Sequence, residues 1–313
     1  MRRTFPVRLS DEPRSNEGMR SYDAPYKSDL QKQLEAGRFV ITAEICPPRG
    51  TDTAVFIEKA RLLKGRITAA NVTDNQRAVM RLSSLACAAV LLKEGIEPVF
   101  QVTCRDRNRL ALQSDILGAW VLGARNILAL TGDHVSFGDH RAAKAVFALD
   151  SVPLVAAIST LNSGKTLSGV ELRGATGFFI GAVVAPEANP FGPEELKFEK
   201  KIAAGARFFQ TQAIYDMEKF KRFFDYASKH DVKILGGILL LKSANMANFL
   251  NKNVPGVHVP QNLIDELSSA KDQLQAGIAI AARQVRELKT FCHGAHIMAI
   301  GQEESVVRII EGA

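Results

Sequence analysis

Residues 39–48 have the sequence FVITAEICPP. Valine, isoleucine and threonine favour strands, and proline cannot donate an N–H to a β-ladder. The run therefore predicts a strand over 39–45 that ends before Pro47 and Pro48. Its apolar character on both faces is typical of a parallel sheet that is covered on both sides. One residue inside this strand is charged, Glu44.

The same pattern recurs along the rest of the chain. Further apolar runs of strand length occur at 68–73, 97–103, 126–130, 177–185, 207–212, 233–241 and 296–300. Helical patterns stand between the runs and after the last one, at 51–64, 82–93, 106–122, 151–162, 194–204, 217–229, 243–249, 261–288 and 304–311. Strands that alternate with helices form parallel βα units, and eight of them predict a (β/α)8 TIM barrel. An open Rossmann sheet is the alternative, but its GxGxxG fingerprint does not follow the first strand.

The first residues differ from the rest of the chain. Residues 1–30 contain three prolines, many charges and few apolar side chains, which predicts an N-terminal polar arm before a barrel domain over 31–313. Such an arm is either flexible or packed on a partner subunit. Arg2 and Arg3 are not followed by the apolar stretch of an export signal, so we expect a cytoplasmic protein.

Composition excludes several classes of protein. The 313 residues carry a net charge of +7, but the basic residues are scattered, so nucleic-acid binding is not expected. No apolar run reaches the length of a membrane-spanning helix. The 4 cysteines form no CxxC pair, which predicts neither a disulfide scaffold nor a metal site.

Chemistry in a TIM barrel occurs where the strands end, so the polar residues there are candidates. Glu44 lies in an apolar strand, and because burial disfavours a charged carboxyl, it is a candidate general acid. The alternative is an acid paired with a lysine or a backbone group. Asp133 follows Leu-Thr-Gly and is either a ligand contact or a turn cap. Gln212 is a candidate reader of a heterocycle or a core amide, and Lys201 a phosphate contact or a surface lysine.

These residues also carry a family resemblance. The chain resembles a methylenetetrahydrofolate reductase of the flavin-dependent MetF type over about residues 30–300. The motifs are TAEICPP at 42–48, NVT at 71–73, VTC at 102–104, LTGD at 130–133, APEANP at 185–190, KKIAAGA at 200–206, QTQ at 210–212 with the following YD at 215–216, and GIL at 237–239. Together and in this order, each at a strand end, they are specific.

The resemblance implies a barrel that holds a flavin and reduces 5,10-methylenetetrahydrofolate to 5-methyltetrahydrofolate. Glu44 would be the general acid that opens the five-membered ring of the substrate. Asp133 would stabilise the cationic iminium beside the flavin. Gln212 would bind the pterin, Phe249 would be the aromatic residue against the ligand, and Gln302 would lie near the folate tail.

The resemblance also implies a set of flavin contacts. The cofactor-binding residues would be Thr73, Gln101, Thr103, Thr131, Gly132, Asp133, Ala185, Glu194 and Lys201. Three of these depart from the pattern of many members, which have histidine at Gln101, arginine at Thr131 and tyrosine at Ala185. The flavin is therefore FAD or FMN, and the sequence leaves both open.

The electron donor is open as well. Family members that use a nicotinamide donor typically have an arginine near the position of Gln302 and an aromatic-rich stretch before it. The sequence at 296–302 has neither. This departure is similar to a subgroup in anaerobes that receives electrons from a partner subunit. We expect an oligomer, and any iron–sulfur relay would lie on that partner, because this chain has no cluster motif. The alternatives are an aldolase- or lyase-type barrel with Lys242 as its reactive lysine, or a non-catalytic barrel subunit.

Overall fold

The computed structural model describes residues 27–140, 142–254 and 257–313. Eight parallel strands close into one barrel in chain order, and this confirms the predicted TIM barrel. The strands are β1 (Val40–Ile45), β2 (Ala69–Val72), β3 (Pro98–Thr103), β4 (Asn126–Leu130), β5 (Phe179–Val184), β6 (Phe208–Ala213), β7 (Lys233–Leu239) and β8 (Gly294–Met298). All eight carboxyl ends therefore lie at one end of the barrel, which we call the mouth.

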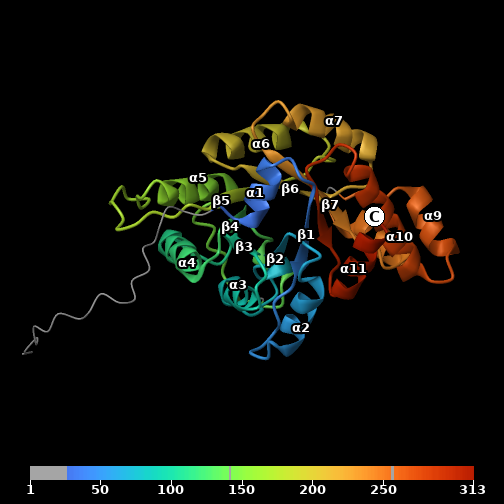
Figure 1. The fold of residues 1–313 in the computed structure, drawn as a ribbon, viewed down its shortest axis with the longest axis horizontal. Coiled ribbons are helices and arrows are strands. Elements are labelled where there is room, and N and C mark those ends of the chain that lie inside the picture. The colour runs from blue at the N-terminus through green and yellow to red at the C-terminus, as the bar shows by residue number, and fades with distance from the viewer. Residues whose placement is uncertain (1–26, 141, 255–256) are drawn as a thin grey trace, which may run out of the picture.

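Helices surround the barrel as a ring in Figure 1. They are α1 (Asp29–Glu35), α2 (Ala54–Leu63), α3 (Ser84–Lys93), α4 (Arg109–Leu122), α5 (Ser151–Asn162), α6 (Gly192–Ala204), α7 (Met217–Ala227), α8 (Ala244–Asn253), α9 (Gln261–Ser269), α10 (Gln273–Leu288) and α11 (Glu303–Glu311). Ser, Asp and Asn side chains cap most of their first turns; Asn108, for example, accepts the N–H groups of Leu110 and Ala111.

Most boundaries differ from the sequence prediction by a few residues, and two of the differences follow from specific contacts. The single helix predicted over 261–288 is two helices, because Ala270 is extended and Asp272 caps a new helix by accepting the N–H of Gln275. The last strand begins at Gly294 rather than at residue 296. Gly294 pairs with Leu235 and Val40, and this pairing extends the strand toward its start.

Helix α1 closes the end of the barrel opposite the mouth and lies across the middle of the ring in Figure 1. Its Leu30 and Leu34 are fully buried against the first inward-facing residues of the strands. Ser28 donates to Asn126 Oδ1 at 2.6 Å, so the chain is tied to the barrel from this residue onward. The predicted arm over residues 1–30 otherwise lies outside the described residues, and its division from the barrel stays a prediction.

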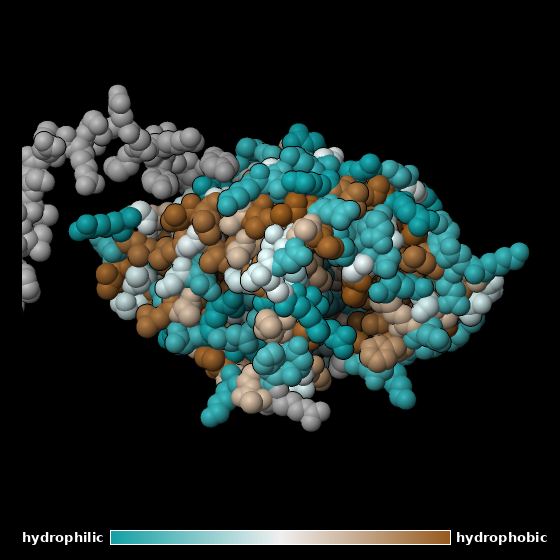
Figure 2. All heavy atoms as spheres, turned by 90° about the horizontal axis from the view of Figure 1, so that it is seen from below, coloured by the Kyte–Doolittle hydropathy of each residue, from teal (hydrophilic) through white to brown (hydrophobic). Residues whose placement is uncertain are grey.

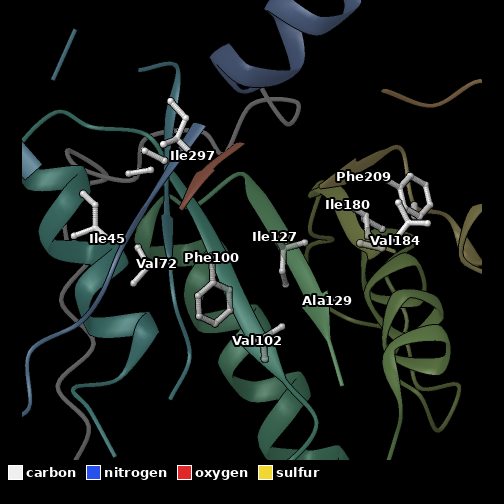
Figure 3. Packing of buried hydrophobic residues seen from close by; sticks show 14 of the residues in the cluster. Ile45, Val72, Phe100, Val102, Ile127, Ala129, Ile180, Val184, Phe209 and Ile297 are labelled. Carbon is white, nitrogen blue, oxygen red and sulfur yellow. The ribbon is translucent and has the colours of Figure 1, made fainter. Parts of the chain in front are cut away.

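The strands alternate between two apolar layers. Outward-facing residues pack against the helices, and Figure 3 shows Ile45, Val72 and Phe100 among them. Inward-facing residues at the starts of the strands fill the closed end and include Val40, Phe208 and Leu235. This alternation fixes which residues nearer the mouth must face inward.

The outer surface mixes polar and apolar side chains. On the face shown in Figure 2, hydrophilic side chains separate several hydrophobic patches. No helix in the described part of the chain is long and apolar enough to cross a bilayer.

Candidate active site

The inner face of the barrel changes from apolar to polar in its middle layer. Thr42 lies opposite His296 on β8, and their side chains form a hydrogen bond of 2.9 Å between Oγ1 and Nδ1. Gln210 on β6 donates to the same Thr42 hydroxyl at 3.2 Å. Gln210 and Asn71 on β2 exchange two amide hydrogen bonds, of 2.7 and 3.0 Å. Four strands are thus joined by one buried polar network.

Glu44 lies one layer nearer the mouth than this network. Its side chain is 12% exposed, and its Oε1 atom lies 3.7 Å from His296 Nε2. The Glu44 carboxyl forms no hydrogen bond with the described residues. The sequence left two roles open for Glu44, a general acid or an acid paired with a lysine or a backbone group. Neither kind of partner is observed among the described residues. Glu44 is therefore a shielded carboxyl that faces the mouth beside a histidine.

The sequence prediction did not include His296 in the site. The signal was present, because His296 stands between Ala295 and Ile297 in an apolar strand. Its ring is 3% exposed, and both ring nitrogens face β1 side chains, Thr42 and Glu44. Only closure of the barrel, which pairs β8 with β1, brings these residues together.

Asp133 is exposed in the loop after β4. Its Oδ2 atom accepts the backbone N–H of Arg77 at 2.9 Å, and its carbonyl accepts Arg105 Nη1 at 3.3 Å. Arg105 is 1% exposed and also donates to the Asn75 carbonyl at 3.2 Å. Asp133 therefore joins the loops after β4 and β2 at the mouth, which is the turn-stabilising role; its role toward a ligand stays a prediction.

The loop after β2 is held in an uncommon backbone conformation. Asn75, Arg77 and Ala78 have φ values of 46°, 58° and 56°, in the left-handed region that non-glycine residues rarely adopt. Such strain persists only where the surrounding structure enforces it, and the bonds from Asp133 and Arg105 do so here.

Gly132 is required for a structural reason. Its φ is +89°, and a Cβ atom at this position would lie 3.0 Å from Thr103 Cβ and 3.3 Å from Arg105 Cβ. The glycine thus allows close approach of Thr103 at the end of β3 and of Arg105 in the loop after it, and its contact with a cofactor stays a prediction.

Three of the predicted cofactor residues have features that suit a bound flavin. Lys201 is 6% exposed, and among the described residues its Nζ donates one hydrogen bond, to the Val183 carbonyl at 2.6 Å. Burial lowers the pKa of this lysine. Because an ammonium has three donors, it can still donate to a phosphate. Thr73 Oγ1 is buried without a nitrogen or oxygen partner. Thr131 lines a cavity of about 480 Å³ with Phe147 and Asp150.

Other predicted cofactor residues already have partners in the protein. The Thr103 hydroxyl and N–H both donate to Asp74 Oδ2 at 2.9 Å, and Arg107 binds the same carboxylate at 2.7 Å. Glu194 accepts the N–H of Ala185 at 3.1 Å. Gln101 differs, because it is 5% exposed and faces inward on β3, but only its backbone carbonyl has a side-chain partner among the described residues, the Ser84 hydroxyl at 3.0 Å. These residues shape the wall of the site.

The three predicted folate contacts lie at different depths. Gln212 is exposed at the end of β6, above the buried Gln210. Gln302 is half-buried and precedes the first turn of α11. Phe249 is 51% exposed on the second turn of α8. Gln212 lies near the carboxyl end of β6, whereas Phe249 and Gln302 lie beyond the carboxyl ends of β7 and β8.

Among the described residues, no three His, Cys, Asp or Glu side chains gather as metal ligands would. Burial raises the pKa of the Cys104 thiol to about 12 and that of Cys87 to about 11. These two thiols are therefore protonated and inert at neutral pH.

Comparison with known proteins gives a family match over nearly the whole described chain. A family model described as "Methylenetetrahydrofolate reductase" matches residues 29–313. A 5,10-methylenetetrahydrofolate reductase of Pectobacterium carotovorum is 28% identical over 68% of this chain and 70% of its own length. Methylenetetrahydrofolate reductase 2 of Schizosaccharomyces pombe is 24% identical over 91% of this chain, which spans about half (47%) of that protein.

Solved structures show the same fold. A protein from Clostridium thermocellum, described as binding two copies of 5-methyl-5,6,7,8-tetrahydrofolic acid, superposes with a TM-score of 0.64 at 17% identity. The match covers 91% of this chain and 97% of that one. A tryptophan synthase from M. tuberculosis superposes with a TM-score of 0.51 at 9% identity. At these identities the likeness concerns the fold alone.

Proposed function

The chain belongs to the methylenetetrahydrofolate reductase family, and from this premise we propose that it reduces 5,10-methylenetetrahydrofolate to 5-methyltetrahydrofolate with a flavin held at the mouth. The observation that carries the proposal is the placement of Glu44. Its carboxyl is shielded, faces the mouth and is free of hydrogen bonds to the described residues, beside His296.

Glu44 is the proposed general acid. The five-membered ring of the substrate must open before its one-carbon unit becomes electrophilic, and opening requires a proton on the leaving nitrogen. A carboxyl that has no protein partner can give its proton to that nitrogen. His296 lies beside the carboxyl, and Thr42 fixes the other ring nitrogen of this histidine. We assign His296 a positioning role.

Asp133 is the proposed electrostatic partner of the opened ring. The opened one-carbon unit is a cationic iminium, and a fixed carboxylate nearby lowers its energy. Asp133 is fixed because it accepts the Arg77 N–H, while Arg105 holds its carbonyl. Gln212, Phe249 and Gln302 are the proposed folate contacts, with Gln212 on the pterin.

The flavin, when bound, supplies the hydride for the one-carbon unit. Lys201 has N–H donors beyond the one that binds the Val183 carbonyl, and Thr73 Oγ1 has no nitrogen or oxygen partner; both suit a flavin, with Lys201 toward a phosphate. Gln101, Thr103, Thr131, Gly132, Ala185 and Glu194 complete the proposed surroundings. The proposed flavin is FAD or FMN. The donor is NADH, NADPH or an iron–sulfur partner subunit, and the sequence at 296–302 favours the partner.

An aldolase-type reaction receives no support from the structure. Lys242, the candidate lysine for that chemistry, donates to the Ile300 carbonyl at 3.1 Å. A non-catalytic subunit would not need a shielded carboxyl beside a buried histidine at the mouth. The placement of Glu44 and His296 therefore favours an enzyme.

The function is tested with purified protein under anaerobic conditions. We expect a yellow protein whose flavin spectrum bleaches on reduction with dithionite. Addition of methylenetetrahydrofolate should restore the oxidised spectrum and yield methyltetrahydrofolate by mass spectrometry. Separate addition of NADH and NADPH identifies the donor, and bleaching by neither indicates a partner subunit. A protein that binds neither FAD nor FMN on reconstitution would contradict the proposal.

A further inference from the structure

One side of the helix ring, formed by the neighbouring helices α3, α4 and α5, is nearly free of charge. Within these three helices only Lys93, Arg109 and Asp115 are charged. Helix α6, which is about as long as α4, has six charged residues. Asp115 Oδ2 lies 2.7 Å from Arg107 Nε, so its charge is neutralised within the chain.

The side of α4 that points away from the barrel is apolar. Four residues form this side, which we call the outer face of α4: Leu110, Ser114, Leu117 and Val121. At 3.6 residues per turn they span only about 60° around the helix, opposite the buried Leu112 and Ile116. Leu110 is 76% exposed and Val121 is 67% exposed. Their spacing of four, three and four residues is that of a coiled-coil seam, so the outer face is suited to a second helix.

The flanking helices leave the outer face of α4 accessible. Ala86 on α3 and Ala156 on α5 are small and exposed, so they do not prevent another helix from approaching α4. In Figure 2, hydrophobic side chains gather at the left, on the side of the ring that holds α4. Exposed apolar groups that adjoin one another mark interaction surfaces on soluble proteins.

The outer face of α4 is complementary to itself. In an antiparallel pair of α4 helices whose twofold axis passes between Ser114 and Leu117, Leu110 of each copy lies beside Val121 of the other. Ser114 of each copy then lies beside Leu117 of the other. A large side chain thus meets a small one at the centre of the pair, which allows the two helices to interdigitate.

The distribution of charge favours a second copy in this orientation. Because the chain has a net charge of +7, two copies repel each other least where they meet through uncharged faces. Parallel helices would put Arg109 beside its own copy, whereas antiparallel helices separate the two by about 20 Å. Each Arg109 would then lie near the C-terminal end of the other α4, where the carbonyls carry partial negative charge and the last turn has no basic residue.

We propose that the outer face of α4 is the twofold interface of a homodimer, in which the two α4 helices pack antiparallel. The occupant is a second copy of this chain, because the face is uncharged, has a seam for one helix and matches itself under a twofold rotation. The inference is independent of the proposed reaction.

Sedimentation of the full-length protein tests the interface. We expect wild type to be a dimer and Leu110→Glu with Val121→Glu to have half its mass. The dissociation constant should rise at least about 100-fold, because the dimer would bury four carboxylates without partners. Both positions are exposed in the single chain, so the far-UV circular dichroism should stay as in wild type. Leu196→Glu, at a 52% exposed leucine on α6, is the matched control and should remain dimeric.

Cysteine cross-linking tests the direction of the helices. Leu110→Cys with Val121→Cys should give a covalent dimer on mild oxidation, with wild type as the control for the native cysteines. Neither single variant should cross-link, because identical positions of the two copies lie about 16 Å apart along the helices. A wild-type monomer, as expected if another part of the chain or a different protein covered this face, would overturn the inference. A dimer that survives both glutamates, or cross-linking by a single variant, would overturn it as well.

Discussion

His296 Nε2 lies 3.7 Å from Glu44 Oε1 across the junction where the last strand of the barrel meets the first. The other ring nitrogen, Nδ1, forms a hydrogen bond with the Thr42 hydroxyl. The same hydroxyl also accepts a hydrogen bond from Gln210. The proposed acid is thus backed by a buried polar layer rather than by the apolar wall that its sequence context indicated. This arrangement restricts the orientations of the carboxyl before substrate arrives.

Replacement of His296 should impair the folate step specifically. We expect His296→Asn to lower the rate of folate reduction about 10- to 100-fold with little change in KM, because a misplaced acid loses rate rather than affinity. The pH profile of that rate should also shift. Rapid-mixing measurements of both half-reactions provide the test, with His258→Asn at an exposed position as the control. An unchanged folate rate and pH profile would show that His296 has no such role.

Gly132 offers a test of the loop geometry. Gly132→Ala should destabilise the protein by about 2–3 kcal/mol, because a methyl group meets Thr103 at 3.0 Å and the φ of +89° is unfavourable. Gly169→Ala is a close control, since its φ is +85° and nothing lies within 4 Å. That variant should cost only about 1 kcal/mol. Urea unfolding measures both, and equal losses would contradict the packing argument.

Lys201 tests the proposed flavin site. Lys201→Met should reduce flavin affinity about tenfold or more, because it removes a buried charge that we place toward a phosphate. Lys200→Met is the matched control, because Lys200 is the exposed neighbour on the same helix. Fluorescence titration of each apoprotein with FAD and with FMN measures the affinities. If both variants keep the wild-type affinity, Lys201 is not a cofactor contact.

His293 should make the stability of the protein depend on pH, independently of catalysis. It lies at the closed end of the barrel, where its Nδ1 accepts the Ile234 N–H, and burial lowers its pKa to about 4. Below pH 6.5, His293 is protonated in the unfolded chain but stays neutral in the folded protein. The free energy of unfolding therefore falls as the pH drops from about 6.5 to about 4. The loss is on the order of 2–3 kcal/mol.

The test compares wild type with His293→Asn in urea unfolding between pH 7 and pH 4. The advantage of wild type over the variant should shrink across that window, because the variant cannot take up this proton. A difference that stays constant with pH would contradict the assignment of a buried neutral histidine.

The fold was predictable because each strand carries its own local signal. Segments such as 39–45 and 126–130 are apolar on both faces, and such segments fit only a sheet covered on both sides. The break at Ala270–Asp272 was missed, since Asp272 lies within an otherwise continuous helical pattern and its capping bond is visible only in the structure. Boundaries of this kind depend on local hydrogen bonds rather than on periodicity.

The site was predictable only in part. Glu44 stands out as a charge in an apolar strand, whereas His296 belongs to the site because barrel closure pairs residues 254 positions apart. The role of Gly132 against Thr103, and that of Asp133 on the loop after β2, also arise from contacts between separate βα units. Single-sequence patterns contain no information on such pairings.

Glu44→Gln tests the central claim most directly, in separate anaerobic measurements of flavin reduction and of flavin reoxidation by methylenetetrahydrofolate. Glutamine keeps the size of the side chain and removes the proton that opens the ring. We expect reoxidation to be slowed at least about 100-fold, with flavin content and flavin reduction close to wild type. Reoxidation by methylenetetrahydrofolate at the wild-type rate would contradict that claim.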